Sequence, residues 1–575
     1  MKKVFSSLVA VILTTALLTG CGSSNNQKAD PTAAENSSNT VASTTANEMP
    51  KDPITFKAYM GTNNSNEWTT PVEKKITELT GVTLDIEKSV GDGKQRISLM
   101  VASGDLPDII FAGTDLKLLM DVNQVEKLDD LIDQYGPNIK KLYGDYLERL
   151  KWSPEIPYMY CLGDQPVGDG KGDAIGGFSV QHAVVKEEGY PKLRTIQDFE
   201  NIIKNYYAKH PTFKGPDGKE QPTIPLLLNG YDWGYFFSIG NPANNVNGGF
   251  DDEWIIDQDT LEAKRHIITD GDKEFLRWLN GLWNQKLIDK ESFTESNDQF
   301  NAKLSSGRVI ATIDGASWDF NGVHAALRGA GMEDRAYGFY PITMNENIKN
   351  PNYVDRGYIG FGSGMAITTE CKDKVRAMQF FNWMAGEEAN VLNAWGVEDV
   401  HWKYDENQKR VILPETLKQK QNDKDFAKKT GIGLYQYPWP RYGNTYLDAT
   451  GNPVTPDIID KDAIISNYTQ VEKEVLAGYG VKLWGDLFPK EDEFKVAPYG
   501  AAFKYEGGMT GDYAAINNKC IELSKKYCAK LIMGKAEDFD KVFDEFVKAM
   551  EAAGVREIEK QFTQAIKDRM AMWNK

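Results

Sequence analysis

Residues 54–112 read ITFKAYMGTNNSNEWTTPVEKKITELTGVTLDIEKSVGDGKQRISLMVASGDLPDIIFA, and this stretch determines the fold class. Apolar residues alternate over residues 54–60 and again over 82–86, which is typical of strands. Residues 108–112 form a third, short apolar run of the kind found in buried strands. Two helical periods separate the runs, and Pro71 opens the first of them. Strand, helix, strand, helix and strand with short connections predict a parallel α/β sheet.

The carboxyl ends of these strands are the places to look for a binding site. Ligands of open parallel sheets bind beyond the carboxyl ends of the strands. The loops after Met60 and after Phe111 are therefore candidate ligand loops. The first loop carries Asn66 and Trp68, and the second carries Asp115. We expect these three side chains to contribute to one wall of a site.

The same pattern recurs later in the chain. Short apolar runs at 223–228, 309–313 and 365–368 lie between helical segments. Trp233 follows the first of these runs, and Trp318 follows the second. Aromatic rings stack on the flat C–H faces of sugars, while amides and carboxylates bond to sugar hydroxyls. Asn66, Trp68, Asp115, Trp233 and Trp318 are thus candidate sugar-binding residues, with packing or surface roles as the alternative for each tryptophan.

The amino terminus has the pattern of a secretory signal. Lys2 and Lys3 precede an apolar run from Val4 to Leu18, and Leu18-Thr-Gly-Cys21 follows. The apolar core is too short for a stable membrane span. The sequence around Cys21 resembles the bacterial lipobox, which implies cleavage before Cys21 and attachment of diacylglycerol and palmitate-type acyl chains. Residues 22–50 are polar and small, so we expect a flexible stalk between the lipid and a globular body.

Composition and motifs exclude several classes of protein. The chain has 575 residues and a net charge of −17, which argues against binding nucleic acid. It has no nucleophile-elbow, dinucleotide-binding, phosphate-loop or His-Glu-x-x-His zinc pattern, and its five histidines are far apart in sequence. We therefore predict no catalytic residues, no metal and no cofactor. A glycosidase that uses two carboxylates is not excluded by pattern.

Several stretches, in this order, are similar to one family. They are VASGDLPDII at 101–110, VEKLDDLI at 125–132, WNQKLIDKESF at 283–293, KVRAMQFFNWM at 374–384, GVEDVHW at 396–402 and LIMG at 531–534. Together with the lipobox they resemble the extracellular solute-binding proteins (family 1) of ABC importers, in particular the large lipoproteins of Gram-positive bacteria. The similarity covers nearly the whole body of the chain.

This resemblance implies a fold and a function. The fold would be the two-lobed α/β fold of periplasmic binding proteins, with a hinge and a ligand cleft between the lobes. The function would be to capture an oligosaccharide at the extracellular face of the cell membrane and deliver it, as a monomer, to the permease. A secreted glycosidase or lyase, or a receptor that feeds a sensor protein, are the alternatives. By analogy, the segments are a signal peptide (1–20), a lipidated stalk (21–50), an N-terminal lobe (51–180 and 342–390) and a C-terminal lobe (181–341 and 391–575).

One loop departs from the family pattern. Family members often carry a calcium loop before the strand that here contains Pro225-Leu-Leu. With Gly218 as the turn glycine, Phe213 and Gly215 replace the first two oxygen ligands, and Ile224 replaces the closing carboxylate. Calcium requires six or more oxygen ligands. We therefore predict that this loop binds no calcium.

Overall fold

The computed structural model describes most of the chain after residue 48. The predictions for Cys21, Asn66 and Trp233 fall outside the described residues, and so does the side chain of Trp318. The described residues are 49–60, 68–87, 93–168, 173, 177–230, 234–239, 253–257, 259–314, 317–350, 364–456, 461–495 and 512–574.

The amino-terminal region forms the first sheet. Its strands have the order β13-β3-β1-β2, and β1 is parallel to both β2 and β3, as predicted. The last strand, β13 (Met365–Ile367), is antiparallel to β3 and comes from far along the chain. The first elements are β1 (Ile54–Tyr59), α1 (Pro71–Thr80), β2 (Val82–Glu87), α2 (Gly93–Ser103), β3 (Ile109–Phe111), α3 (Leu116–Asp121), α4 (Asp129–Tyr135) and α5 (Pro137–Tyr143).

Local sequence explains where α1 begins and ends. Thr70 caps the helix, and its hydroxyl and the Glu73 carboxylate satisfy each other's backbone N–H groups. Pro71 occupies the first turn, where its missing N–H costs nothing. Gly81 ends the helix with a φ of 72°, and a Cβ there would lie 2.5 Å from the carbonyl oxygen of Lys51. A larger residue at this turn would collide with the backbone.

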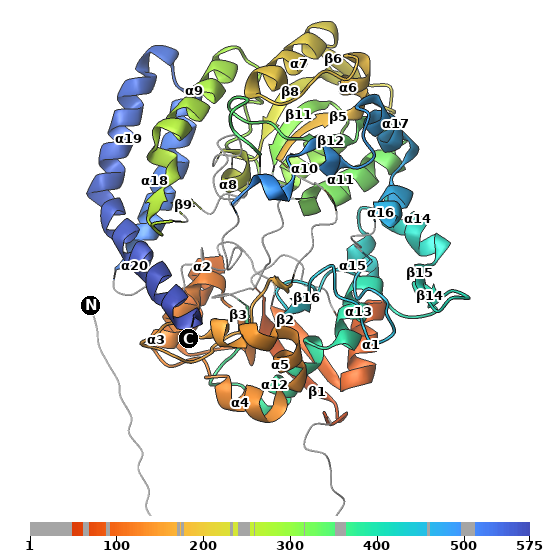
Figure 1. The fold of residues 1–575 in the computed structure, drawn as a ribbon, viewed down its shortest axis with the longest axis vertical. Coiled ribbons are helices and arrows are strands. Elements are labelled where there is room, and N and C mark those ends of the chain that lie inside the picture. The colour runs from red at the N-terminus through yellow and green to blue at the C-terminus, as the bar shows by residue number, and fades with distance from the viewer. Residues whose placement is uncertain are drawn as a thin grey trace, which may run out of the picture. The chain divides into compact units, whose positions relative to one another are not determined.

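The first sheet is covered on both faces. Alternate residues of its strands belong to two separate apolar cores, because side chains of a strand point to opposite faces. Ile109 and Phe111 pack into the larger core, which also contains side chains of α1, α4, α5 and α12 (Lys374–Met384). Ile110 packs into the smaller core with side chains of α2 and α3. Figure 1 shows these helices grouped around the strands.

The second sheet is mixed. Its order is β12-β5-β11-β8, with β11 parallel to β8 and antiparallel to β5. The strands predicted at 223–228 and 309–313 are present as β8 and β11, whereas β5 and β12, which pair antiparallel with each other, were not predicted. Three separate two-stranded sheets pair β6 with β7, β9 with β10 and β4 with β16. The elements of this part of the chain are β4 (Pro166–Val167), β5 (Gly177–Gln181), α6 (His182–Glu187), α7 (Ile196–Lys209), β6 (Thr212–Lys214), β7 (Glu220–Pro222), β8 (Ile224–Leu228), α8 (Gly234–Ser238), β9 (Trp254–Ile256), β10 (Ala263–Arg265), α9 (Asp270–Asn284), α10 (Asn297–Ser305), β11 (Val309–Asp314), α11 (Ser317–Gly329) and β12 (Tyr337–Tyr340).

The carboxyl-terminal helices complete the core of the second sheet. Apolar side chains of α9 and of the three final helices join those of β8 and β11 in one core. None of the helices in the described residues is long and apolar enough to cross a membrane. The remaining elements are α13 (Glu387–Trp395), β14 (Trp402–Tyr404), β15 (Arg410–Ile412), α14 (Pro414–Asn422), α15 (Phe426–Thr430), β16 (Arg441–Tyr442), α16 (Lys461–Asn467), α17 (Gln470–Gly478), α18 (Tyr513–Met533), α19 (Phe539–Ala553) and α20 (Val555–Trp573).

The core of the first sheet extends further along the chain than the predicted division at residue 390. Buried side chains as far as Val454 belong to it. Trp439, for example, packs edge-on against Phe380 and Phe381 of α12, with ring centroids 5.5 and 5.3 Å apart. Side chains of α17 join the core of the second sheet instead. The chain therefore changes from one core to the other after Val454, because this aromatic segment buries its rings over α12.

Candidate functional site

The carboxyl ends of the parallel strands form one edge in each sheet. In the first sheet, Tyr59 of β1 pairs with Ile110 of β3, so both strands end together. In the second sheet, Ile313 of β11 pairs with Leu228 of β8. The chain leaves β12 at the carboxyl edge of the second sheet, because Tyr340 pairs with Phe178, which pairs with Ile313 at the end of β11. It enters β13 at the carboxyl edge of the first sheet, because Met365 pairs with Phe111 at the end of β3. The two edges nominated by the sequence are thus joined directly by the chain.

Trp68 follows β1 in the chain, but its indole packs along α1 toward the amino end of the sheet. The indole N–H donates a hydrogen bond of 2.8 Å to the Thr77 hydroxyl, which donates to the Val82 carbonyl oxygen at the start of β2, and the ring lies 5.4 Å from that of Tyr435. A role of Trp68 in binding sugar stays a prediction. The backbone of Trp68 has a φ of 54°, a conformation that large side chains rarely adopt. Residues held in such conformations concentrate at functional sites. The indole is half-buried. Its N–H is hydrogen-bonded within the protein, and part of the ring is exposed to solvent.

Asp115 lies at the carboxyl edge of the first sheet. It ends a 3-10 turn, Gly113–Asp115, that follows β3 directly, and it precedes α3. Its side chain is half-buried. The position agrees with the prediction that the loop after Phe111 brings a carboxylate to the carboxyl edge.

A tyrosine that sequence reasoning missed completes the first wall. The ring of Tyr437 packs edge-on against Phe111 at the end of β3, with 5.3 Å between centroids, and 40% of Tyr437 is exposed. Partial burial, and then the nearby Asp164 carboxylate, raise the pKa of Tyr437, so its hydroxyl stays protonated and can donate. The available signal was the aromatic and proline-rich run LYQYPWPRY at 434–442, which no helical or strand period explains.

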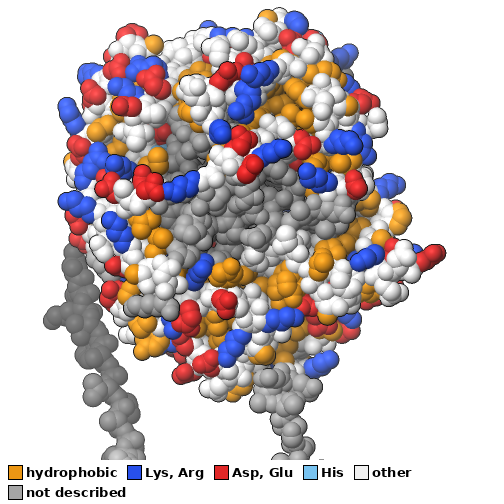
Figure 2. All heavy atoms as spheres, in the orientation of Figure 1, with side chains coloured by type: hydrophobic (Ala, Val, Ile, Leu, Met, Phe, Trp, Pro, Cys, Tyr) orange, Lys and Arg blue, Asp and Glu red, His pale blue; other side chains and the backbone are white. Residues whose placement is uncertain are grey.

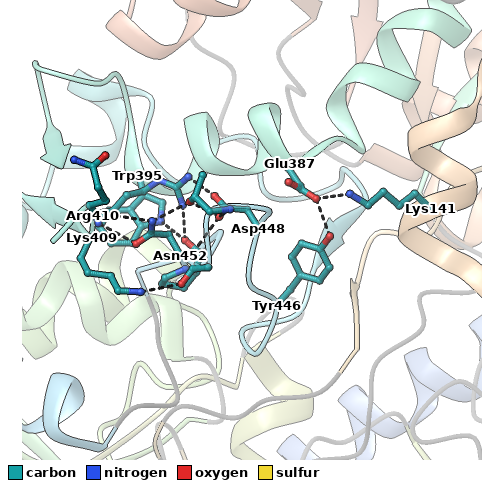
Figure 3. Close-up of polar contacts among 12 residues, drawn as sticks. Lys141, Glu387, Trp395, Lys409, Arg410, Tyr446, Asp448 and Asn452 are labelled. Atoms are coloured by element: carbon teal, nitrogen blue, oxygen red, sulfur yellow. Dashed lines mark hydrogen bonds and ion pairs between the residues drawn. The ribbon is translucent and has the colours of Figure 1, made fainter.

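The segment that carries Tyr437 is fastened to the first lobe at two places (Figure 3). Glu387 lies between Lys141, at 2.5 Å, and the hydroxyl of Tyr446, at 2.7 Å. Nearby, Arg410 of β15 forms a buried ion pair with Asp448. These contacts hold residues 446–448 against α13 and the β14–β15 hairpin. They therefore restrict the position of the aromatic run at 434–442 that precedes them.

The Asp448 turn is built from short polar contacts. The Asp448 carboxylate accepts hydrogen bonds from the backbone N–H groups of Thr450 (2.8 Å) and Asn452 (3.1 Å) and from the Thr450 hydroxyl. The Asn452 amide in turn donates to the Gln408 carbonyl oxygen at 2.9 Å. Burial raises the pKa of Asp448, but the hydrogen bonds from Thr450 and Arg410 outweigh burial and hold the pKa below its usual range.

At the carboxyl edge of the second sheet, buried polar contacts hold the strand ends together. The Asn229 N–H, directly after β8, donates to the Ser238 hydroxyl at 2.9 Å, and that hydroxyl donates to the Ile313 carbonyl oxygen of β11. A Cβ at Gly234 would overlap the Asn229 side chain at 2.0 Å, so α8 can begin there only with glycine. Trp318 is the second residue of α11, four residues beyond the end of β11.

The described residues show no metal centre. They contain no group of three or more His, Cys, Asp or Glu side chains placed to hold a metal ion. On the face shown in Figure 2, acidic and basic side chains are interspersed rather than gathered by sign. The chemistry that is present at the first edge consists of aromatic faces, hydroxyls and carboxylates, which is the set that neutral polyhydroxylated ligands require.

A family comparison agrees with this geometry. Residues 72–397, more than half of the chain, match the model of the family described as bacterial extracellular solute-binding protein. The chain belongs to this family. A curated relative, the fructooligosaccharide ABC transporter substrate-binding protein FusA of Streptococcus pneumoniae, is 26% identical over 409 residues, which are 68% of this chain and 71% of the relative.

Solved structures show the same fold at lower identity. The alginate-binding protein AlgQ2 without calcium superposes with a TM-score of 0.64 at 19% identity, over 90% of this chain and 98% of that chain. FusA in complex with kestose gives 0.60 at 17% identity, over 91% and 100%. An extracellular solute-binding protein of Bifidobacterium longum subsp. infantis gives 0.61 at 15% identity, over 90% and 98%. The two-lobed fold of periplasmic binding proteins, expected from the sequence, is therefore confirmed.

Proposed function

We propose that this solute-binding protein is the lipid-anchored receptor of an ABC transporter, which captures an oligosaccharide outside the cell and delivers it to the permease. The observation that carries the ligand class is the end of β3, where the exposed Tyr437 ring packs edge-on against Phe111 and the turn that follows the strand carries Asp115. Two of the similar proteins are named for saccharide ligands, a fructooligosaccharide and alginate, which supports the same class for this chain.

The proposed mechanism is closure of the two lobes on the ligand. Aromatic faces of the first lobe would stack on one side of a sugar ring, and Trp318 and Trp233 of the second lobe would approach from the other side. Asn66 and Asp115 would bond to hydroxyls. A ligand that contacts both lobes stabilises the closed state by its differential affinity for that state. Small-angle scattering should therefore show a smaller radius of gyration when the cognate ligand is added.

A ligand screen tests the proposed ligand class. Fructooligosaccharides, alginate oligosaccharides and oligopeptides should be compared by thermal shift, because a ligand that binds only the folded protein raises its melting temperature. We expect a saturable shift with one class of oligosaccharide, confirmed as one-site binding by calorimetry. A saturable shift with peptides alone would contradict the proposal.

The same samples separate a receptor from an enzyme. Incubation of the protein with the oligosaccharide that binds, followed by chromatography of the sugar, should return it intact. Steady release of shorter products would show a glycosidase or a lyase instead. Uptake of labelled ligand by cells that lack the chain distinguishes delivery to a permease from signalling, since only delivery requires the receptor for uptake.

The proposed anchor has its own test. Metabolic labelling with a palmitate analogue should mark the protein, and Cys21→Ala should abolish both the label and retention in the membrane fraction. An anchor with more than one acyl chain is needed for stable attachment, and a lipidated cysteine supplies it. Label that persists in the Cys21→Ala variant would exclude this anchor.

A further inference from the structure

A cavity lies at the amino ends of the parallel strands of the second sheet, opposite their carboxyl edge. Its volume is about 260 Å³, and it is lined by Gln181 at the end of β5, Thr223 just before β8 and Arg308 just before β11. The register pairs Val309 with Ile224, so both parallel strands begin here. Four residues of strand, about 13 Å, separate this edge from the candidate sugar site.

Cationic side chains surround this cavity, although the chain as a whole carries a net charge of −17. Arg335, Arg308, Lys214 and His210 line it, and no lining residue is acidic. In the described part of the chain, Lys214 and Arg308 form no ion pair. Arg335 has only a distant contact, 3.9 Å, with the exposed Asp334. Three cations thus border the cavity without a close carboxylate partner.

The acidic groups of the neighbourhood have other partners. Both oxygens of Glu187 lie 2.9 Å from Nε2 of His210, so that histidine is already paired. Glu220 accepts a hydrogen bond of 2.6 Å from the Thr212 hydroxyl at the rim. Asp289 and Glu291, which line the adjoining cavity on the far side of Arg308, both bind Lys303, at 3.1 and 2.9 Å. The positive charge of the cavity is therefore not cancelled from within.

The arginine is held in place by buried partners. Arg335 donates from Nη1 to the Tyr206 hydroxyl at 3.1 Å and to the Gln181 side-chain oxygen at 3.4 Å. The Gln181 amide, which is buried, is itself fixed by a 3.0 Å hydrogen bond to the Gly307 carbonyl oxygen. The Arg335 guanidinium also lies over the ring of Phe213, 4.9 Å from its centroid. Such prepositioning reduces the entropy lost when a ligand binds.

A second arginine of the cavity is also held in place. Arg308 donates from Nη1 to the Pro222 carbonyl oxygen at 3.2 Å, so its guanidinium is anchored beside the start of β8. Both guanidinium groups are therefore positioned by the fold before an anion binds.

We propose that this cavity binds a tetrahedral oxyanion, phosphate or sulfate, through Arg335, Arg308 and Lys214. Guanidinium groups match such anions because their N–H groups form a rigid fork and remain charged. The bound anion links the β6–β7 hairpin, which carries Lys214, to the starts of β8 and β11. The site is separate from sugar capture, so the two can fail independently.

Calorimetry with inorganic phosphate tests the proposal. Phosphate, sulfate and glycerol phosphate should be titrated into the full chain at constant ionic strength. We expect saturable one-site binding of phosphate or sulfate. Binding of glycerol phosphate with equal affinity would assign the natural ligand to phosphate monoesters, and rejection of it would assign the free ion. Heat that does not saturate with any of the three anions would overturn the proposal.

Variants locate the binding. Arg335→Gln and Lys214→Gln should each weaken binding at least about tenfold, the effect of one lost charge-assisted bond. Arg96→Gln in α2 is the matched control, since Arg96 pairs with Glu87 in the first lobe, and it should leave binding unchanged. Lys214 lies on the exposed hairpin, so its variant should fold normally even if Arg335→Gln does not. Equal affinity in the Lys214 variant and the control would overturn the site.

Discussion

Two buried polar groups, Asp448 in the first lobe and His182 in the second, differ in whether hydrogen bonds satisfy them. In the first lobe, the Asp448 carboxylate accepts four hydrogen bonds, from Thr450 twice, from Asn452 and from Arg410. In the second lobe, both ring nitrogens of His182 are buried without any hydrogen-bond partner, although the ring is stacked on Trp484 at 5.7 Å. The hydrogen bonds to Asp448 stabilise the local structure. The unpaired ring nitrogens of His182 destabilise the folded state, and protonation or substitution of this residue changes that contribution.

This difference indicates what each region can do. The paired Asp448 turn fixes the segment that carries Tyr437, so the aromatic edge is formed before any ligand arrives. The unpaired ring of His182 in the second lobe marks a place where the fold leaves a polar group unsatisfied. Its neighbours are the Trp484 ring and the cations Lys186 and Arg328, so we expect a pH effect there.

Asp448→Ala should have the largest effect on stability. It removes one partner of an ion pair whose side chains are 5% and 6% exposed, and so leaves the Arg410 charge buried without its carboxylate. Breaking a buried pair in this way costs about 3–5 kcal/mol in the free energy of unfolding. Denaturant titration followed by tryptophan fluorescence measures it. Glu545→Gln, in the exposed pair with Lys530, is the control and should cost far less, because solvent screens that pair. Equal losses in the two variants would show that burial of the Asp448 pair adds nothing to its effect on stability.

The fold of the first lobe was predictable, and the frame around its edge was not. Alternation over 54–60 and 82–86, with Pro71 and the glycine turn between, gave the parallel strands and the helix because these signals are local. The pairing of β13 with β3 joins residues more than 250 apart, and the packing of Trp439 on Phe380 of α12 joins residues 59 apart. Neither contact has a local signature, so the division of the lobes near residue 390 missed the aromatic segment.

Acid should act on the second lobe first. Burial, and then the charges of Lys186 and Arg328, lower the pKa of His182 from 6.5 to about 3. His324 behaves alike, since burial and the adjacent His182 lower its pKa. The unfolded chain therefore binds more protons than the folded protein below pH 6.5, and the free energy of unfolding falls as the pH falls through this range.

The size of this effect is set by the pKa difference. For His182 alone, the loss between neutral pH and pH 5 is about 2 kcal/mol. Asp448 contributes nothing in that range, because a carboxyl with a lowered pKa loses its stabilising effect only near and below its unfolded value of about 3.9. In the His182→Phe variant, the number of protons taken up on unfolding at pH 5 should fall by about one. The free energy of unfolding should therefore depend less on pH between 7 and 5, and it should not fall at pH 7. An unchanged slope in that variant would show that other groups carry the acid sensitivity.

Tyr437→Ala tests whether the fixed first edge binds the ligand. We expect the affinity for the oligosaccharide to fall about tenfold, or about 1.4 kcal/mol, from loss of a stacking face. Tyr146 is 39% exposed against 40% for Tyr437, so Tyr146→Ala is a matched control that should bind normally. Calorimetry measures both. Equal affinity in the two variants would exclude Tyr437 from the site.

The paired test on the second lobe is Trp318→Ala. If that lobe closes on the sugar, affinity should fall tenfold to a hundredfold while the melting temperature of the free protein stays within a few degrees. Unchanged affinity in both the Trp68→Ala and the Trp318→Ala variants would rule out the predicted site. The sequence nominated both tryptophans by their place after strands, but it could not nominate Tyr437, which reaches the end of β3 from over 300 residues away.

Removing metal ions should have the smallest effect, namely none. In the hairpin of β6 and β7, Asp217 already accepts a 3.0 Å hydrogen bond from the Lys219 N–H and lies 3.4 Å from the Lys219 ammonium group, while Phe213 and Gly215 offer no side-chain oxygen. A calcium ion placed there would meet cations from Lys214 and Lys219 instead of six or more oxygens. EDTA should therefore leave the melting temperature unchanged, and phosphate should raise it. This result would show that the hairpin binds an anion and not a cation. A fall of several degrees with EDTA that calcium reverses would overturn this assignment, and it would place the metal elsewhere in the chain or show that this loop was aligned wrongly. Both titrations on one preparation decide between the two signs of charge.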